Sequence, residues 1–156
     1  MHCTMTRAGI ILYGYRPDAS VPPVLDLKPA MTVKARGVQV RDIPAHTTIS
    51  YGRTYETAEP TRMAVISMGY ADGYLRTGSG KAHVILDGKR APVIGRICMD
   101  MCMVRIPEGA NVHRGDEVTV FGPDGWTAED AAEAAGTISY EVLCAVSRRV
   151  PRYYIG

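Results

Sequence analysis

The sequence predicts a mainly β domain, in which an antiparallel, barrel-like sheet is followed by two short helices near the C-terminus. Short apolar segments recur between residues 31 and 121, with turn signals between them. No alternation of strands with long helices follows the first apolar segment, which argues against a parallel sheet. Many short strands joined by turns are typical of a closed or nearly closed antiparallel barrel.

The length and composition are those of one domain, or of one domain with a fragment of another. Of the 156 residues, 46% are hydrophobic, with one tryptophan and one phenylalanine, so the expected core is mostly aliphatic. A net charge of +2 is too small to indicate nucleic-acid binding. The sequence has no apolar run of membrane-spanning length and no signal-peptide pattern. From the charge we expect no nucleic acid as a partner, and from the apolar pattern no membrane.

The cysteines and histidines do not form a metal-binding pattern. The cysteines include no CxxC pair and the histidines are scattered, so we predict no metal site. Reduced thiols are then expected, which is typical of a cytosolic protein. The residues concerned are Cys3, Cys98, Cys102, Cys144, His2, His46, His83 and His113.

Residues 1–15 differ in pattern from the rest of the chain. Gly9–Tyr13 is a short apolar run without polar alternation, which suits a strand buried on both faces of a parallel sheet. We therefore expect residues 1–15 to be the end of a larger domain that is absent here. Residues 16–26 have the composition of a linker, and the β domain is expected over residues 27–156.

The expected strands follow from two kinds of pattern. Residues 31–41 alternate between apolar and polar side chains, as in a strand that is buried on one face. Residues 83–86 and 90–94 flank Asp87-Gly88, a dipeptide that favours a tight hairpin turn. Further strands are expected over residues 63–68, 101–106 and 116–121.

Two helices are expected after the last strand. Thr127 precedes a run with acidic residues in its first turn and Gly136 at its end, so we predict a helix over residues 127–135 with Thr127 as its N-cap. Ser139 is the predicted cap of a second helix over residues 140–147, which Pro151 follows.

The stretch Ser50–Tyr55 is the first candidate for a functional site. Gly52 allows the backbone to turn where a side chain would clash. Tyr51 then stands at the boundary of an apolar strand, where loops tend to carry function. The alternative is a tyrosine that only covers the rim of the domain.

Three further stretches combine glycine with charged or aromatic residues: Arg7–Ile10, Gly69–Arg76 and Gly95–Met101. Gly9 can bring backbone N–H groups close to a phosphate, or it can simply let a helix pack closely. The second stretch is either functional or an ordinary turn in which Asp72 bonds its own backbone. For the third, the alternative is core packing, and Cys98 has no base nearby in sequence to make it a nucleophile.

Together and in this order, these stretches resemble the C-terminal part of alanine racemase, a bacterial enzyme that uses pyridoxal 5'-phosphate (PLP). The resemblance covers essentially the whole chain. Any one motif is weak evidence, whereas eight in the same order are specific. The matching pieces are Arg7–Gly14, Leu27–Ala30, Ser50–Gly52, Gly69–Gly73, Arg90–Pro92, Gly95–Asp100, Thr137–Cys144 and Arg149–Arg152.

The resemblance implies an N-terminal (β/α)8 barrel that holds PLP, followed by a β domain, in a head-to-tail homodimer in the cytoplasm. Each active site combines the barrel of one subunit with the β domain of the other. Residues 1–15 match the end of that barrel. The lysine that binds PLP covalently belongs to the missing part, so we expect the chain alone to be inactive. The lysines that do not match it are Lys28, Lys34, Lys81 and Lys89.

The resemblance also implies roles for individual residues. Tyr51 matches the second catalytic base, which acts in the partner's site, and Arg7 matches the residue that contacts the pyridine nitrogen of PLP. The backbone N–H groups of Gly9 and Ile10 and the hydroxyl of Tyr140 match contacts with the cofactor phosphate. The remaining matches are Met99, whose backbone contacts the substrate carboxylate, and the entrance-corridor residues Tyr70, Arg76, Arg96, Asp100 and Ile138.

Racemisation of the small amino acid substrate needs two bases. One removes the Cα proton on one face, the other returns a proton on the opposite face, and the roles reverse for the other enantiomer. A free phenol has a pKa of about 10, so a tyrosine base needs positive charge nearby, for which Arg7 and a histidine of the missing barrel are the candidates. A serine or broad-specificity racemase and a non-catalytic β-barrel interaction module are the alternative functions.

Overall fold

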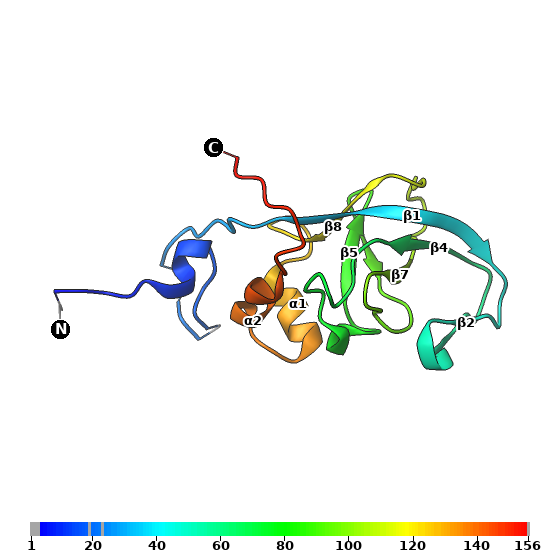
Figure 1. The fold of residues 1–156 in the computed structure, drawn as a ribbon, viewed down its shortest axis with the longest axis horizontal. Coiled ribbons are helices and arrows are strands. Elements are labelled where there is room, and N and C mark those ends of the chain that lie inside the picture. The colour runs from blue at the N-terminus through cyan, green and yellow to red at the C-terminus, as the bar shows by residue number, and fades with distance from the viewer. Residues whose placement is uncertain (1–3, 19, 23, 156) are drawn as a thin grey trace.

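The computed structural model describes residues 4–18, 20–22 and 24–155. Its main element is a six-stranded antiparallel sheet with the strand order β6-β5-β8-β1-β4-β7 (Figure 1). A two-stranded ribbon, β2 (Thr48–Ile49) with β3 (Tyr55–Glu56), projects from one end. The strands of the main sheet are β1 (Val33–Ile43), β4 (Thr61–Ile66), β5 (His83–Leu86), β6 (Lys89–Pro92), β7 (Cys102–Arg105) and β8 (Glu117–Phe121).

The sheet is nearly closed, which confirms the predicted barrel-like fold. β1 forms a corner, because its first half pairs with β8 and its second half with β4, with a register shift between Gly37 and Gln39. Val93, directly after β6, bridges to Val104 in β7, so the two edge strands meet. Every strand expected from residue 31 onward is present, with ends displaced by at most two residues.

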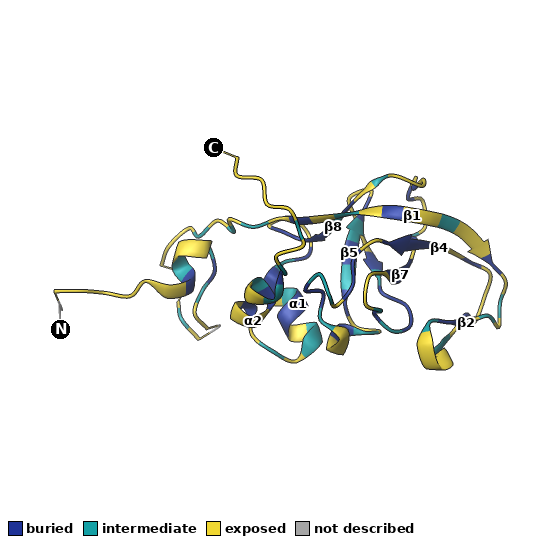
Figure 2. Ribbon diagram, in the orientation of Figure 1, coloured by how far each residue is buried: buried dark blue, intermediate teal, exposed yellow. Residues whose placement is uncertain are grey.

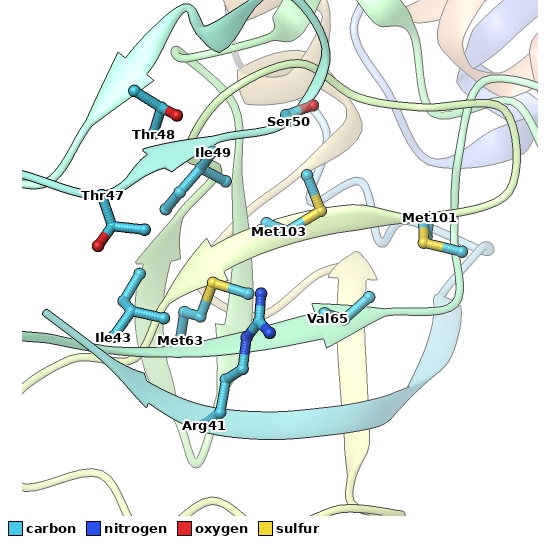
Figure 3. Close-up of a pocket in the computed structure, with 10 residues that line it drawn as sticks. All are labelled: Arg41, Ile43, Thr47, Thr48, Ile49, Ser50, Met63, Val65, Met101 and Met103. Atoms are coloured by element: carbon cyan, nitrogen blue, oxygen red, sulfur yellow. The ribbon is translucent and has the colours of Figure 1, made fainter.

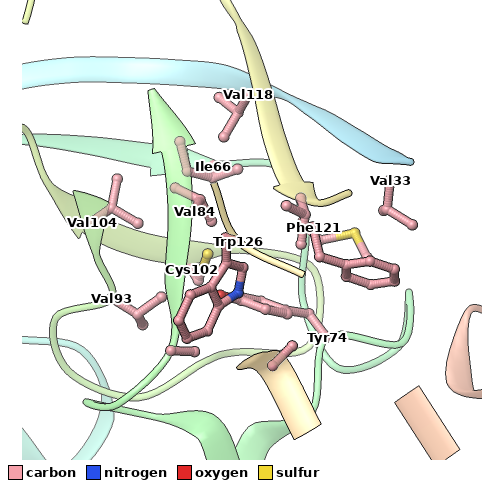
Figure 4. Close-up of a cluster of buried hydrophobic side chains, with 14 of the residues drawn as sticks. Val33, Ile66, Tyr74, Val84, Val93, Cys102, Val104, Val118, Phe121 and Trp126 are labelled. Carbon is pink, nitrogen blue, oxygen red and sulfur yellow. The ribbon is translucent and has the colours of Figure 1, made fainter. Parts of the chain in front are cut away.

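Two separate clusters of buried side chains hold these elements together. The larger lies between the sheet and the helices, and Figure 4 shows Tyr74 and Trp126 packed among the valines of β5, β7 and β8. The smaller lies beneath β2 and consists of Ile43, Ile49, Met63, Val65, Ile94 and Met103. The ribbon that carries Tyr51 therefore has hydrophobic support of its own.

The prediction of a buried strand over Gly9–Tyr13 is wrong. This segment is a 3-10 helix, η1 (Gly9–Tyr13), in which Ile10 is buried while Leu12 and Tyr13 are 75% and 56% exposed. An apolar run without alternation fits either structure, and no described strand lies beside it to complete a ladder. Gly9 has a φ of 63° and no atom within 4 Å of a Cβ added to it, so close helix packing does not explain the glycine.

The helix α1 (Ala128–Ala135) begins and ends as predicted. The Thr127 hydroxyl accepts a hydrogen bond from the N–H of Asp130 at 3.1 Å, and the Asp130 carboxylate accepts one from the N–H of Thr127 at 2.8 Å. Gly136 ends the helix with a φ of 73°. None of the described helices has the length and apolarity needed to cross a membrane.

The predicted cap of the second helix is wrong. The helix α2 spans Ser139–Ala145, and its N-cap residue is Ile138, which has the extended backbone (φ −117°, ψ 154°) that capping requires. Ser139 is already in the first turn, where its buried side chain makes no capping hydrogen bond.

We predict that Thr127→Ala lowers the free energy of unfolding by about 1–2 kcal/mol, because it removes a reciprocal cap at the start of a helix that packs on the core. Ser139→Ala is the matched control, with an expected change of less than about 0.5 kcal/mol. Urea denaturation followed by circular dichroism measures both. Equal losses in the two variants would contradict the assignment of the two caps.

Candidate functional site

Tyr51 stands at the tip of the projecting ribbon. Ile49 pairs with Tyr55 across β2 and β3, and the 3-10 helix η2 (Tyr51–Arg53) connects the two strands. Ile49 is buried in the smaller hydrophobic cluster, whereas Tyr51 is 73% exposed. Figure 2 shows the turn that follows β2 in the colour of exposed residues. The ribbon therefore fixes the backbone on which Tyr51 is carried and leaves its side chain open to another molecule.

The backbone before Tyr51 is strained. Ser50 has φ 66° and ψ −178°, a conformation that glycine adopts far more easily than serine. Its hydroxyl donates to the carbonyl oxygen of Arg96 at 2.8 Å. Gly95 permits this approach, since a Cβ there would lie 2.8 Å from the Cβ of Ser50. Such strain costs about 1–3 kcal/mol per residue, and it clusters at functional sites.

A cavity of about 160 Å³ opens beside β2. In Figure 3 its walls come from β1, β2, β4 and β7, and the Arg41 side chain extends toward Met63 and Val65. Most of the lining side chains are apolar, namely Ile43, Ile49, Met63, Val65, Met101 and Met103. The polar ones are Arg41, Thr47, Thr48 and Ser50. This set contains no acid–base pair, so the cavity by itself offers no group for proton transfer.

Two of the candidate stretches pack backbone against backbone. The N–H groups of Tyr70 and Ala71 donate to the carbonyl oxygens of Cys98 and Met99, both at 3.0 Å. Gly69 makes this possible, because a Cβ there would lie 2.3 Å from the Met99 oxygen. The 3-10 helix η3 (Arg76–Gly78) joins the same group through Ser79, whose hydroxyl accepts from the N–H of Ile97 at 3.0 Å.

These hydrogen bonds connect the segments that carry six of the predicted site residues. The Arg96 side chain lies beside the Tyr51 loop, with its Nε 3.6 Å from a Cβ added at Gly52. That Nε is buried and has no hydrogen-bond partner among the described residues. Tyr70 and Met99 are 42% and 53% exposed, so Met99 is not the core filler that the alternative interpretation supposed. The segments carry Tyr51, Tyr70, Arg76, Arg96, Met99 and Asp100.

The other predicted site residues lie elsewhere. In Figure 1 the segment with Arg7, Gly9 and Ile10 occupies the opposite end of the long axis from the ribbon that carries Tyr51. Ile138 and Tyr140 are exposed at the start of α2, whose other end packs against Gly73. One chain therefore does not bring Arg7 close to Tyr51.

Sequence reasoning missed two features of this region. No local pattern reveals that a serine will hold a positive φ, so the strain at Ser50 was not expected. Arg149 donates to the carboxylates of both Asp72 and Asp100, at 2.6 and 2.5 Å, across 77 and 49 residues of chain. Asp72 also accepts from the N–H of Gly69 at 2.9 Å, so its carboxylate bonds the backbone of its own loop as well.

The cysteines near the site differ in their chemistry. Burial raises the pKa of Cys102 to about 12, with the charge of Cys98 as a smaller cause. A raised pKa means that the folded chain holds the thiol proton more tightly than the unfolded chain, which stabilises the fold. Because an unfolded thiol ionises near pH 9, this stabilisation is complete below that pH. It is lost at about 1.4 kcal/mol per pH unit as the pH rises from 9 toward 12.

We predict that iodoacetamide at pH 8.5 modifies the exposed Cys144 of the folded chain and leaves Cys102 unmodified. Cys102 should react only after denaturation, because its thiolate is not populated in the fold. Peptide mapping by mass spectrometry distinguishes the two sites. Modification of both at the same rate under native conditions would refute the prediction.

Comparisons with known proteins agree on one family. The family model described as "Alanine racemase, C-terminal domain" matches residues 30–154. An alanine racemase of Desulfovibrio desulfuricans is 49% identical over 154 residues, which are 99% of this chain and 42% of that protein.

Solved structures give the same result for the fold. The chain superposes with a TM-score of 0.85 and 44% identity on alanine racemase of Clostridium difficile 630 in complex with cycloserine, covering 91% of this chain and 38% of that one. For alanine racemase of Streptomyces coelicolor the TM-score is 0.89 and the identity 39%, over 94% of this chain and 39% of that one. The chain thus spans about two fifths of the length of the relatives it matches. A family model covering most of the chain, with high identity and a shared fold, shows that the chain belongs to the family of alanine racemase C-terminal domains.

Proposed function

We propose that the chain acts as the C-terminal part of a PLP-dependent alanine racemase, which interconverts L- and D-alanine for bacterial cell-wall synthesis. The observation that carries the proposal is 49% identity with an alanine racemase across 99% of the chain. The exposed Tyr51 on its strained, supported ribbon adds a candidate base. The division into a barrel end (1–15), a linker (16–26) and a β domain (27–156) belongs to the same proposal.

In this proposal the Tyr51 oxygen exchanges a proton with Cα of the substrate on one face. A group in the remaining part of the enzyme serves the opposite face, since racemisation requires a base on each side. Arg96, whose buried Nε lacks a partner among the described residues, places a cation beside the Tyr51 loop, which itself carries Arg53.

The cofactor-contacting residues are open to a ligand. A Cβ on Gly9 would meet no atom within 4 Å, Arg7 is exposed, and Tyr140 is 39% exposed. Backbone N–H groups and a hydroxyl suit a phosphate, and an arginine suits a ring nitrogen that accepts a hydrogen bond, so this donor set fits PLP. When bound, PLP supplies the electron sink that weakens the Cα–H bond. In this proposal Gly9, Ile10 and Tyr140 hold the phosphate, and Arg7 orients the ring.

The substrate carboxylate is assigned to the Met99 backbone. Among the described residues its N–H donates to no acceptor, while its carbonyl oxygen accepts from Ala71. In this proposal the corridor to this position is lined by Tyr70, Arg76, Arg96 and Asp100 of one chain and by Ile138 of the other, since Ile138 lies beside Tyr140 at the start of α2.

In this proposal the racemase is a head-to-tail homodimer, and the separation of the two groups of residues supports that arrangement. The segment that contains Arg7 and the ribbon that carries Tyr51 lie at opposite ends of the long axis in Figure 1, so one complete site needs the ribbon of one chain and the Arg7 segment of another. Exposed apolar side chains around the Tyr51 end fit such an interface, namely Tyr51, Tyr70, Met99 and Met101.

A chimeric enzyme, which we call the joined enzyme, tests the proposal. In it, this chain replaces the matching C-terminal part of the Desulfovibrio desulfuricans alanine racemase, and conversion of L-alanine to D-alanine is measured with and without PLP. We expect activity that depends on PLP, and none from this chain alone. Preference for L-serine would favour the broad-specificity alternative. A folded joined protein that binds PLP and converts neither amino acid would support the non-catalytic module.

A further inference from the structure

We propose that Arg149 is a positioning residue that holds the Tyr70 loop and the Met99–Asp100 segment in one fixed arrangement. This inference rests on the proposed function, because it assigns both segments to the substrate corridor. Arg149 donates through Nε to Asp72 at 2.6 Å and through Nη2 to Asp100 at 2.5 Å. One side chain therefore links the two segments from the end of the chain.

Asp72, one of the two partners of Arg149, is itself held in place by further hydrogen bonds. Asp72 accepts from the N–H of Gly69 through its other oxygen, at 2.9 Å, and its backbone carbonyl accepts from the N–H of Ser147 at 3.1 Å. The Asp72 side chain is only 14% exposed, so it is a well-ordered partner for the guanidinium. Displacing Arg149 removes its hydrogen bonds to Asp100 and to one carboxylate oxygen of Asp72 at the same time.

The chemistry of the side chain explains why an arginine stands here. A planar guanidinium presents several N–H donors in fixed directions, so it can bond two carboxylates at once, whereas an ammonium group is a single point charge. The hydrogen bond to Asp72, followed in size by the one to Asp100, raises the pKa of Arg149, so the guanidinium stays protonated. At 48% side-chain exposure the ion pairs contribute little to overall stability, so their effect is on geometry.

Hydrogen exchange tests this role without any activity measurement. The reporters are the N–H groups of Tyr70 and Ala71, which join the two segments. In Arg149→Met we expect both amides to exchange about 10-fold faster or more, while the melting temperature changes by less than about 3 °C. Arg148→Met is the matched control, since Arg148 is an exposed neighbour that bonds no described residue. Equal exchange in the two variants would overturn the proposal.

Kinetics of the joined enzyme complete the test. Arg149→Met should raise KM for alanine about 10-fold with a smaller change in kcat, because a displaced corridor weakens substrate positioning. Arg149→Lys should recover part of that loss. Faster exchange with an unchanged KM would overturn the positioning role. If the unmodified joined enzyme is inactive, the proposed function fails, and hydrogen exchange alone decides whether Arg149 holds the loops.

Discussion

Tyr51→Phe is expected to lower kcat of the joined enzyme by about 10²- to 10⁴-fold in both directions, which is the usual contribution of a general acid–base group. Both directions suffer because each needs one base and one acid on opposite faces of the substrate. The change removes one oxygen from a side chain that is 73% exposed, so the fold and the melting temperature should stay the same.

Isotope exchange separates loss of a base from loss of substrate binding. In deuterated water, the Tyr51→Phe enzyme should still exchange the Cα proton of one enantiomer, through the base on the other face, while it exchanges that of the opposite enantiomer about 100-fold more slowly or worse. Proton NMR of alanine follows both. Tyr153→Phe, at a tyrosine that is 87% exposed in the C-terminal segment, is the control and should change neither rate. Full racemase activity in Tyr51→Phe would remove Tyr51 from the mechanism.

Gly69→Ala is expected to cost about 3 kcal/mol or more of unfolding free energy, the largest effect on stability that we predict. A Cβ at this position would lie 2.3 Å from the carbonyl oxygen of Met99 and 2.4 Å from that of Cys98. Both atoms belong to backbone that accepts hydrogen bonds from Tyr70 and Ala71, so neither can move without breaking them. The melting temperature should therefore fall by about 6–12 °C.

Gly37→Ala is the matched control for this variant. Gly37 also lacks a positive φ, and a Cβ there would meet its nearest atom, the carbonyl oxygen of His113, at an ordinary 3.6 Å. A strand residue gains from replacing glycine, so we expect no loss of stability. Calorimetry of both variants measures the difference. A melting temperature of Gly69→Ala within 2 °C of the unmodified chain would show that the two segments separate easily, and would also weaken the role proposed for Arg149.

Local patterns predicted the elements whose structure depends on local interactions. Alternation and the Asp87-Gly88 turn located β1, β5 and β6, and the spacing of Thr127, Asp130 and Gly136 located α1. The two failures have local causes as well. An apolar run such as Gly9–Tyr13 suits several structures until its neighbours are known, and at Ser139 the polar residue lies one position inside the helix that it was expected to cap.

In the candidate site, too, local patterns predicted some features and only the tertiary structure showed the others. By itself the sequence determined the strands, the first helix and the motifs that resemble alanine racemases, because each depends on residues that are close in the chain. The tertiary structure alone decided that Ser50 is strained against Gly95, that Gly69 meets Met99 and that Arg149 bonds two aspartates. It also decided that the segment containing Arg7 and the ribbon carrying Tyr51 lie at opposite ends of the long axis of the molecule. These relations join residues tens of positions apart, and only packing determines which distant segments come into contact.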